Sequence, residues 1–188
     1  IEDTDVDRED VVENIFGSDF DDLIAAGLND DIVDARGGND NIFAGSGNDL
    51  MLGGAGHDKI DGSSGNDIMD GGTGRDDLTG GEGEDLFVFA DFDRGFDVIR
   101  DFVPGTDQIV IDHPGMDSVE SLRFVKFKYE DTRSALIRFR DENGSVDKSL
   151  GGIVLKGVNH KKLSEDDFIF GDPPDLDPEG EEEIDQIK

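Results

Sequence analysis

An aspartate recurs at every ninth residue through the first half of the chain, each time in a stretch rich in glycine. The eight positions are Asp22, Asp31, Asp40, Asp49, Asp58, Asp67, Asp76 and Asp85. Carboxylates held close together repel one another unless a cation lies between them. A flexible cage of carboxylate and carbonyl oxygens, roughly six or more in number, favours Ca²⁺ over Mg²⁺. The chemistry that this spacing offers is therefore calcium binding.

The sequence around these aspartates repeats in units of nine residues from Gly17 to Val88, without an insertion. Positions 1 to 6 are rich in Gly, Ser, Asn and Asp, which accept tight turns and positive φ angles. Positions 7 to 9 predict a short strand with one inward apolar residue at position 8. Those residues are Ile24, Val33, Ile42, Met51, Ile60, Met69, Leu78 and Phe87. Such a repeat predicts a solenoid.

Two units make one coil of eighteen residues, and neighbouring coils are predicted to pair as parallel strands. Successive turns then fall on opposite edges of a flattened coil, so that the aspartates stack in two rows, at about 4.7–4.9 Å per coil. Asp22, Asp40, Asp58 and Asp76 form one row, and Asp31, Asp49, Asp67 and Asp85 form the other. We expect the metal-free repeats to be largely unfolded, with binding and folding as one event. The alternative is that these aspartates are ordinary solvated turn residues.

The unit "GGAGHDKID" resembles the calcium-binding RTX (repeats-in-toxin) nonapeptide, and "GGTGRDDLT" and "GGEGEDLFV" match the same pattern. This resemblance implies an all-β fold, a parallel β-roll over residues 17–88. The segment "DLFVFADFDRGFDVIRDFVPGTDQIVID" is similar to the one that follows the roll in serralysin-type proteases and alginate epimerase R-modules.

The resemblance also implies the calcium ligands. In that family one Ca²⁺ lies between turns eighteen residues apart, bound by two backbone carbonyls and the aspartate of each turn. The four donor sets are Arg36, Gly38 and Asp40 with Gly53, Ala55 and Asp58; Gly45, Gly47 and Asp49 with Gly62, Ser64 and Asp67; Gly54, Gly56 and Asp58 with Gly71, Thr73 and Asp76; and Ser63, Gly65 and Asp67 with Gly80, Glu82 and Asp85. The first two units depart from the pattern, because Phe20 and Asn29 replace the glycine of position 4. If sites also form at Asp22/Asp40 and Asp31/Asp49, the number of calcium ions rises from four to six at most.

Residues 89–170 contain several strand-like segments and are expected to form a β-rich cap over the open end of the roll. Asp97, Asp101 and Asp107 either supply one more calcium site or are surface acids. In "VKFKY" and "ALIRFR", apolar and basic residues alternate. If these strands pair as a hairpin, Lys126, Lys128, Arg138 and Arg140 share one face that could hold an anionic polysaccharide. The alternative is an ordinary charged surface.

The composition limits the possible partners. The chain has 188 residues, with 48 acids against 17 lysines and arginines, a net charge of −31 and no cysteine. Such a charge argues against nucleic acid and anionic membranes and in favour of cations. No apolar run is long enough for a transmembrane helix. Residues 1–16 are predicted to be an acidic lead-in, and residues 171–188 an acidic disordered tail or linker.

No catalytic motif is evident. His57, His113 and His160 lie outside any HExxH sequence, and neither G-x-S-x-G nor a P-loop is present, so we expect no enzyme activity. The resemblance implies a calcium-binding module that passes a bacterial type I secretion channel unfolded and folds outside the cell. We expect the chain to be a piece of a larger secreted or cell-surface protein. The alternative is an accessory module that binds an anionic polysaccharide or a cell surface for an extracellular enzyme or adhesin.

Overall fold

The computed structural model describes residues 13–90, 95–141, 143–147 and 149–171. Their regular structure is nearly all β, and three short 3₁₀ helices connect strands. One sheet has seven strands, in the order β1 (Asn14–Phe16), β3 (Ile32–Asp34), β5 (Leu50–Leu52), β8 (Ile68–Asp70), β11 (Leu86–Phe89), β13 (Gln108–Ile111) and β17 (Phe168–Phe170). The other has eight, in the order β14 (Leu122–Tyr129), β15 (Thr132–Phe139), β16 (Gly152–Leu155), β12 (Phe96–Ile99), β10 (Asp77–Glu82), β7 (Lys59–Ser64), β4 (Asn41–Ser46) and β2 (Leu23–Leu28). Strands β6 (Ala55–Gly56) and β9 (Thr73–Gly74) pair separately, and the helices are η1 (Val119–Ser121), η2 (His160–Lys162) and η3 (Glu165–Asp167).

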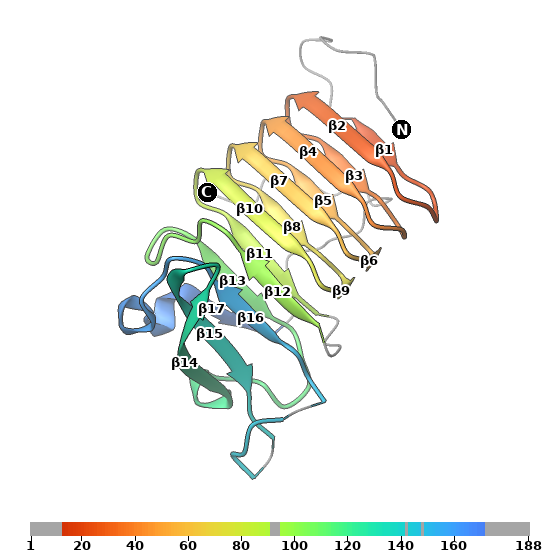
Figure 1. The fold of residues 1–188 in the computed structure, drawn as a ribbon. Helices are drawn as coiled ribbons and strands as arrows, with labels where there is room; N and C mark the ends of the chain where they lie inside the picture. The colour runs from red at the N-terminus through yellow and green to blue at the C-terminus, as the bar shows by residue number, and fades with distance from the viewer. Residues whose placement is uncertain (1–12, 91–94, 142, 148, 172–188) are drawn as a thin grey trace.

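The repeats form the parallel β-roll that the sequence predicts. Ile24 pairs with Ile42, and Ile42 with Ile60, so each strand pairs with the one eighteen residues later. The strands of the two sheets alternate along the chain, and Figure 1 shows them as two rows lying face to face. Two nonapeptides therefore make one coil, as the spacing indicates.

The core of the roll is built from position 8 of each unit. All eight residues at this position, from Ile24 to Phe87, are at most 1% exposed. Side chains alternate between the two faces of a strand, so the residues on either side of position 8 face outward. One apolar residue per short strand is therefore enough to fill the core. The core cluster continues into residues that follow the repeats, such as Phe102 and Phe168.

The two sheets do not end where the nonapeptides end. Leu78 pairs in parallel with Ile99, and Phe87 with Ile109, so the coils continue with steps of 21 and 22 residues in place of eighteen. Strands β16 and β17 extend the same two sheets. The region expected to cap the roll from residue 89 is thus continuous with it in both sheets.

A hairpin covers the C-terminal end of the roll. Strands β14 and β15 pair antiparallel, and β15 joins β16. Leu122, Ile137 and Phe139 are buried, and the ring of Phe124 lies 5.5 Å from that of Phe168 on β17, measured between centroids. Figure 1 shows this hairpin at the end of the molecule opposite β1. The expected β-rich cap is therefore present.

The expectation of one face with four cations is wrong. The hairpin turn has two residues, Glu130 and Asp131, with φ of 45° and 64°, and this short turn sets a register in which Lys126 lies opposite Ala135 and Arg138 opposite Arg123. Directly opposed residues share a face, so the even-numbered lysines of β14 and the even-numbered arginine of β15 point to opposite faces. Lys126 and Lys128 therefore share one face, Arg138 lies on the other, and Arg140 follows the end of β15.

The predicted ends of the chain lie mostly outside the described residues. Only residues 13–16 of the acidic lead-in and Gly171 of the acidic tail are described. Within the described part of the chain, no helix has the length and apolar character needed to cross a membrane.

Candidate metal centre

The repeat aspartates are buried. Their exposed fraction is 2% or less at seven of the eight positions, Asp31, Asp40, Asp49, Asp58, Asp67, Asp76 and Asp85. Aspartate is rarely so deeply buried unless it is paired or coordinates a metal. The alternative in which these residues are solvated turn residues is therefore wrong.

One oxygen of each buried carboxylate has a fixed partner in the preceding coil. The Asp40 backbone N–H donates to Asp58 Oδ1 at 2.8 Å, and the Asp58 N–H donates to Asp76 Oδ1 at 2.9 Å. The second row shows the same contact, from Asp49 N–H to Asp67 Oδ1 at 2.9 Å. These bonds orient each carboxylate and hold the aspartates in two rows at the predicted interval of eighteen residues.

In the middle of the two rows the other carboxylate oxygen accepts no hydrogen bond. The buried atoms concerned are Oδ2 of Asp40, Asp49, Asp58 and Asp67. A buried charged oxygen without a partner is costly, because it has lost water and gained nothing in return. A row of such atoms fits a cation as the missing partner.

Backbone carbonyls from the next coil lie beside these orphaned oxygens. The point that a Cβ on Gly53 would occupy lies 2.8 Å from both Asp58 Oδ2 and the Gly71 carbonyl oxygen. At Gly62 the corresponding distances are 2.3 Å to Asp67 Oδ2 and 2.7 Å to the Gly80 carbonyl oxygen. Glycine at these positions leaves room for carboxylate and carbonyl oxygens to converge, which is the donor set that Ca²⁺ prefers.

The expected donors are mainly main-chain atoms. Within the ranges that the structure describes, no group of three or more His, Cys, Asp or Glu side chains is placed to hold a metal ion. Each expected site has only two aspartates, and four carbonyls complete it. The residues present fit calcium through this mixed set and would not suit a metal that requires nitrogen or sulfur ligands.

Burial changes the acidity of these carboxyl groups. Desolvation, with a smaller contribution from neighbouring aspartates, raises the pKa of Asp49 and of Asp85 to about 7. Desolvation likewise raises the pKa of Asp58 and of Asp67 to about 6. At neutral pH the metal-free fold must therefore hold charged groups whose environment disfavours the charge.

We predict that acid partly replaces calcium. The folded metal-free protein binds more protons than the unfolded chain between about pH 4 and pH 7, so its stability falls as the pH rises through this window. In the presence of a chelator, far-UV circular dichroism should show more β-structure at pH 5 than at pH 7.5. The samples should be monomeric by light scattering, because the chain loses net charge in acid. Equal or smaller β-content at pH 5 would contradict the assignment of raised pKa values.

Asp22, at the N-terminal end of its row, differs from the aspartates in the middle. The Asp22 carboxylate accepts hydrogen bonds from the Ser18 N–H at 2.7 Å and the Ser18 hydroxyl at 2.8 Å, and these bonds lower its pKa. Its Oδ2 atom thus has partners within its own turn, whereas the Oδ2 atoms of Asp40 and Asp58 in the same row accept no hydrogen bond. In the turn where Phe20 stands in place of glycine, the protein itself therefore supplies partners for the aspartate.

Asp97, Asp101 and Asp107 do not lie together as one calcium site, which was one of the two alternatives for them. Asp97 accepts a hydrogen bond from the Asp76 N–H at 2.9 Å, whereas Asp107 accepts one from the Asp85 N–H at 3.4 Å. They therefore continue different rows, on opposite edges of the roll. Asp101 accepts from the N–H groups of Gly80 and Gly81, at 3.0 and 2.9 Å. The coils that follow the repeats thus keep an aspartate in each row, although the nine-residue spacing is lost.

Comparison with protein families agrees with this geometry. The family model for the RTX calcium-binding nonapeptide repeat spans four copies of the repeat. It matches residues 16–51 and again residues 52–87. The chain carries RTX nonapeptide repeats. Because the RTX repeats coincide with the buried aspartates and the converging carbonyls, they imply calcium binding by this part of the chain.

Solved structures support the same fold. The solution structure of the AlgE6R3 subunit from the Azotobacter vinelandii mannuronan C5-epimerase is 29% identical, with a TM-score of 0.55, and the match covers 81% of this chain and 80% of that one. The AlgE6R2 subunit of the same epimerase is 24% identical, with a TM-score of 0.51, over 86% of this chain and 94% of that one. Comparison with curated proteins gives no significant match.

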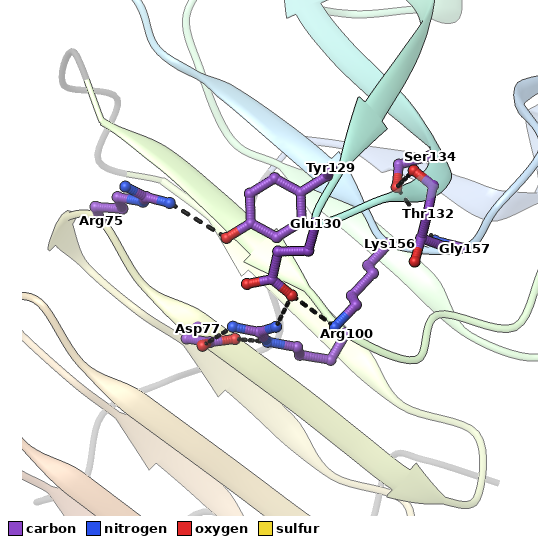
Figure 2. A network of polar contacts seen from close by, with 9 residues as sticks. All are labelled: Arg75, Asp77, Arg100, Tyr129, Glu130, Thr132, Ser134, Lys156 and Gly157. Carbon is purple, nitrogen blue, oxygen red and sulfur yellow. Dashed lines mark hydrogen bonds and ion pairs between the residues drawn. The ribbon is translucent and has the colours of Figure 1, made fainter.

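Sequence reasoning missed a polar network that fastens the hairpin to the RTX roll (Figure 2). Arg100 on the roll pairs with Asp77 and, at 3.0 Å, with Glu130 in the hairpin turn. Lys156 reaches the same Glu130 oxygen at 2.8 Å, and the Arg75 guanidinium donates to the Tyr129 hydroxyl at 3.2 Å. No sequence signal could have found these contacts, because the partners are 23 to 54 residues apart.

Proposed function

We propose that the chain is a calcium-triggered folding module of a larger secreted protein. The observation that carries this proposal is the pair of rows of buried aspartates with orphaned Oδ2 atoms. These charges oppose folding until divalent cations bind between the coils, so calcium binding supplies free energy of folding. The module has no catalytic role of its own and supports the folding and stability of its parent protein.

Four calcium sites follow from the four donor sets named in the sequence. Each ion would join one coil to the next through two aspartates and four backbone carbonyls. Asp58 and Asp67 would each serve two ions, while Asp40, Asp49, Asp76 and Asp85 would each serve one. The hydrogen bonds of Asp22 with Ser18 argue against a site at Asp22/Asp40. The Asp31/Asp49 site remains as a fifth position.

The proposed site of action is outside the cell. Extracellular calcium modules bind with Kd of roughly 10⁻⁴–10⁻³ M, an affinity that leaves them empty in the cytosol and filled outside. An unfolded chain suits passage through a type I secretion channel, and the net charge of −31 keeps it from collapsing before export. Calcium outside the bacterium would then trigger folding.

A calcium titration tests this function. In a chelator at pH 7.5, far-UV circular dichroism should show mostly coil, and millimolar Ca²⁺ should produce a β-spectrum in a cooperative transition. The same concentration of Mg²⁺ should fail, because Mg²⁺ requires a stricter octahedral geometry and gives up its water reluctantly. A β-spectrum that is unchanged by the chelator, or restored equally well by Mg²⁺, would contradict the proposal.

A second proposed function is the binding of an anionic polysaccharide. It is favoured by similarity to two subunits of a mannuronan C5-epimerase, an enzyme whose name denotes a uronate polymer. The net charge of −31 would repel such a polymer in general, so binding would require a local site with unpaired cations. Isothermal titration of the calcium-loaded chain with a mannuronate hexamer tests this function, and the absence of heat at millimolar ligand would exclude it.

A further inference from the structure

A groove lies on the outer face of the eight-stranded sheet, at the C-terminal end of the roll. Its volume is about 390 Å³, and its lining comes from β15, β16 and β12 together with the end of β14 and one turn of the roll. Val98 and Val154 form an apolar floor and are only 2% and 3% exposed, although they face outward. Leu136 and Phe96 extend this apolar surface.

Two arginines, Arg75 and Arg138, line this groove. The Arg138 side chain lies beside Gly152, where an added Cβ would come within 3.1 Å of its Cδ atom. Its guanidinium carbon lies 5.0 Å from the centroid of the Phe96 ring. Arg75 also lines the groove, and its guanidinium donates a hydrogen bond to the hydroxyl of Tyr129 (Figure 2). Both cations are therefore positioned by contacts with neutral groups.

Neither arginine is neutralised by the described part of the protein. Arg138 Nε is buried and has no hydrogen-bond partner there. The ion pairs found among the described residues use Arg100, Lys128 and Lys156, and none uses Arg75 or Arg138. In a chain with 48 acids and 17 lysines and arginines, two unpaired guanidinium groups at one groove point to an anion supplied from outside.

We propose that this groove binds a uronate residue of an anionic polysaccharide. A planar guanidinium matches a carboxylate in charge and geometry, and Arg138 and Arg75 would hold the carboxylate while the apolar face of the sugar ring lies on Val98 and Val154. A few polar groups around an apolar floor are typical of ligand sites. The inference rests on the second proposed function and gives it a site.

The site also depends on the metal-binding part of the chain. Arg75 immediately precedes Asp76, and Asp77 follows it and pairs with Arg100. Arg100 in turn pairs with Glu130 in the hairpin turn, so the turn that presents Asp76 also holds both Arg75 and the hairpin in place. Ligand binding should therefore require calcium even though no calcium ligand touches the groove.

The protein contains its own reporter for this groove. Tyr129 is the only tyrosine and there is no tryptophan, so emission excited in the tyrosine band comes from the groove alone. In the calcium-loaded full chain, with free calcium held constant by dialysis, a mannuronate hexamer should change this emission saturably. Arg138→Gln should weaken binding roughly tenfold or more, through the loss of a charge-assisted contact. Arg75→Gln should act in the same direction, and its calcium-induced circular dichroism, like that of Arg138→Gln, should remain native.

Lys126→Gln is the matched control, because it removes the same charge from the opposite face of the hairpin; it should leave binding unchanged. A methyl-esterified hexamer should bind at least tenfold more weakly than the free acid. Undiminished binding in both arginine variants would show that the groove is not the binding site, while polysaccharide binding itself would stand. Equal affinity for free acetate would show that the ligand is not a polymer. No binding at all would contradict both the groove site and the polysaccharide function, and circular dichroism of the same sample would show whether it had folded with calcium.

Discussion

Asp58→Asn should raise the calcium concentration needed for folding by roughly tenfold or more. Asp58 would serve two ions at once, and its Oδ2 atom is one of the buried oxygens without a partner. Asparagine keeps the Oδ1 acceptor for the Asp40 N–H, but it replaces an anionic calcium ligand with an amide group. Calcium affinity depends on the number of charged ligands, so two sites should weaken together. Circular dichroism followed against free calcium concentration measures this change.

Asp61→Asn provides the control for charge alone. Asp61 lies in the same coil, on the partly exposed strand β7, where it accepts a hydrogen bond from the Ser63 hydroxyl at 3.0 Å. The two substitutions change the net charge equally, but only Asp58 belongs to a row of buried carboxylates. The calcium midpoint of Asp61→Asn should match that of the native chain. If both variants shifted the midpoint equally, the effect would be general electrostatics and Asp58 would not be a ligand.

Gly56→Ala should prevent the RTX roll from folding at millimolar calcium. Gly56 has a φ of 149°, and a Cβ at this position would lie 1.6 Å from the Gly38 carbonyl oxygen of the preceding coil. The backbone conformation alone costs on the order of 1–3 kcal/mol for a residue with a side chain, and separating the coils would displace the carbonyl that is proposed to bind calcium. Urea unfolding and the calcium midpoint should both report the loss.

Gly37→Ala is the matched control for this variant. Its added Cβ would lie 3.6 Å from the Ala55 carbonyl oxygen, an ordinary contact, and the equivalent positions of other repeats already hold Ala55, Ser46 and Thr73. We expect its calcium midpoint and stability to stay close to those of the native chain. Equal loss of folding in the two variants would show that glycine content matters more than the close approach of the coils.

The sequence was sufficient to predict the roll because one residue type recurs in it without a break. Asp at position 6 and a large apolar residue at position 8 fix the turn, the inward side chain and the interval of eighteen residues together. A shift by one residue would turn the core side chains outward, so the register was fully specified. The orphaned Oδ2 atoms add what the sequence could not show, namely that the aspartates are buried and only half satisfied.

The region after the repeats could be predicted only in part. Alternating apolar and polar residues indicate its strands. The turns between them differ in length, so the spacing did not predict that both sheets continue, with Leu78 paired to Ile99 and Phe87 to Ile109. The hairpin register depends on Glu130 and Asp131, which adopt positive φ without a glycine, so no turn signature marked it. In that register Arg138 lies on the face opposite Lys126, where it lines the groove together with Arg75.

An anomalous-scattering map of crystals grown with calcium would locate the bridging ions themselves. We expect peaks in two rows along the edges of the roll. One peak should lie between Asp58 and Asp76, about 2.3–2.6 Å from carboxylate and carbonyl oxygens. Crystals of the same fold with only water between these aspartates, or with calcium confined to the exposed surface, would contradict the claim that bridging ions hold the coils together.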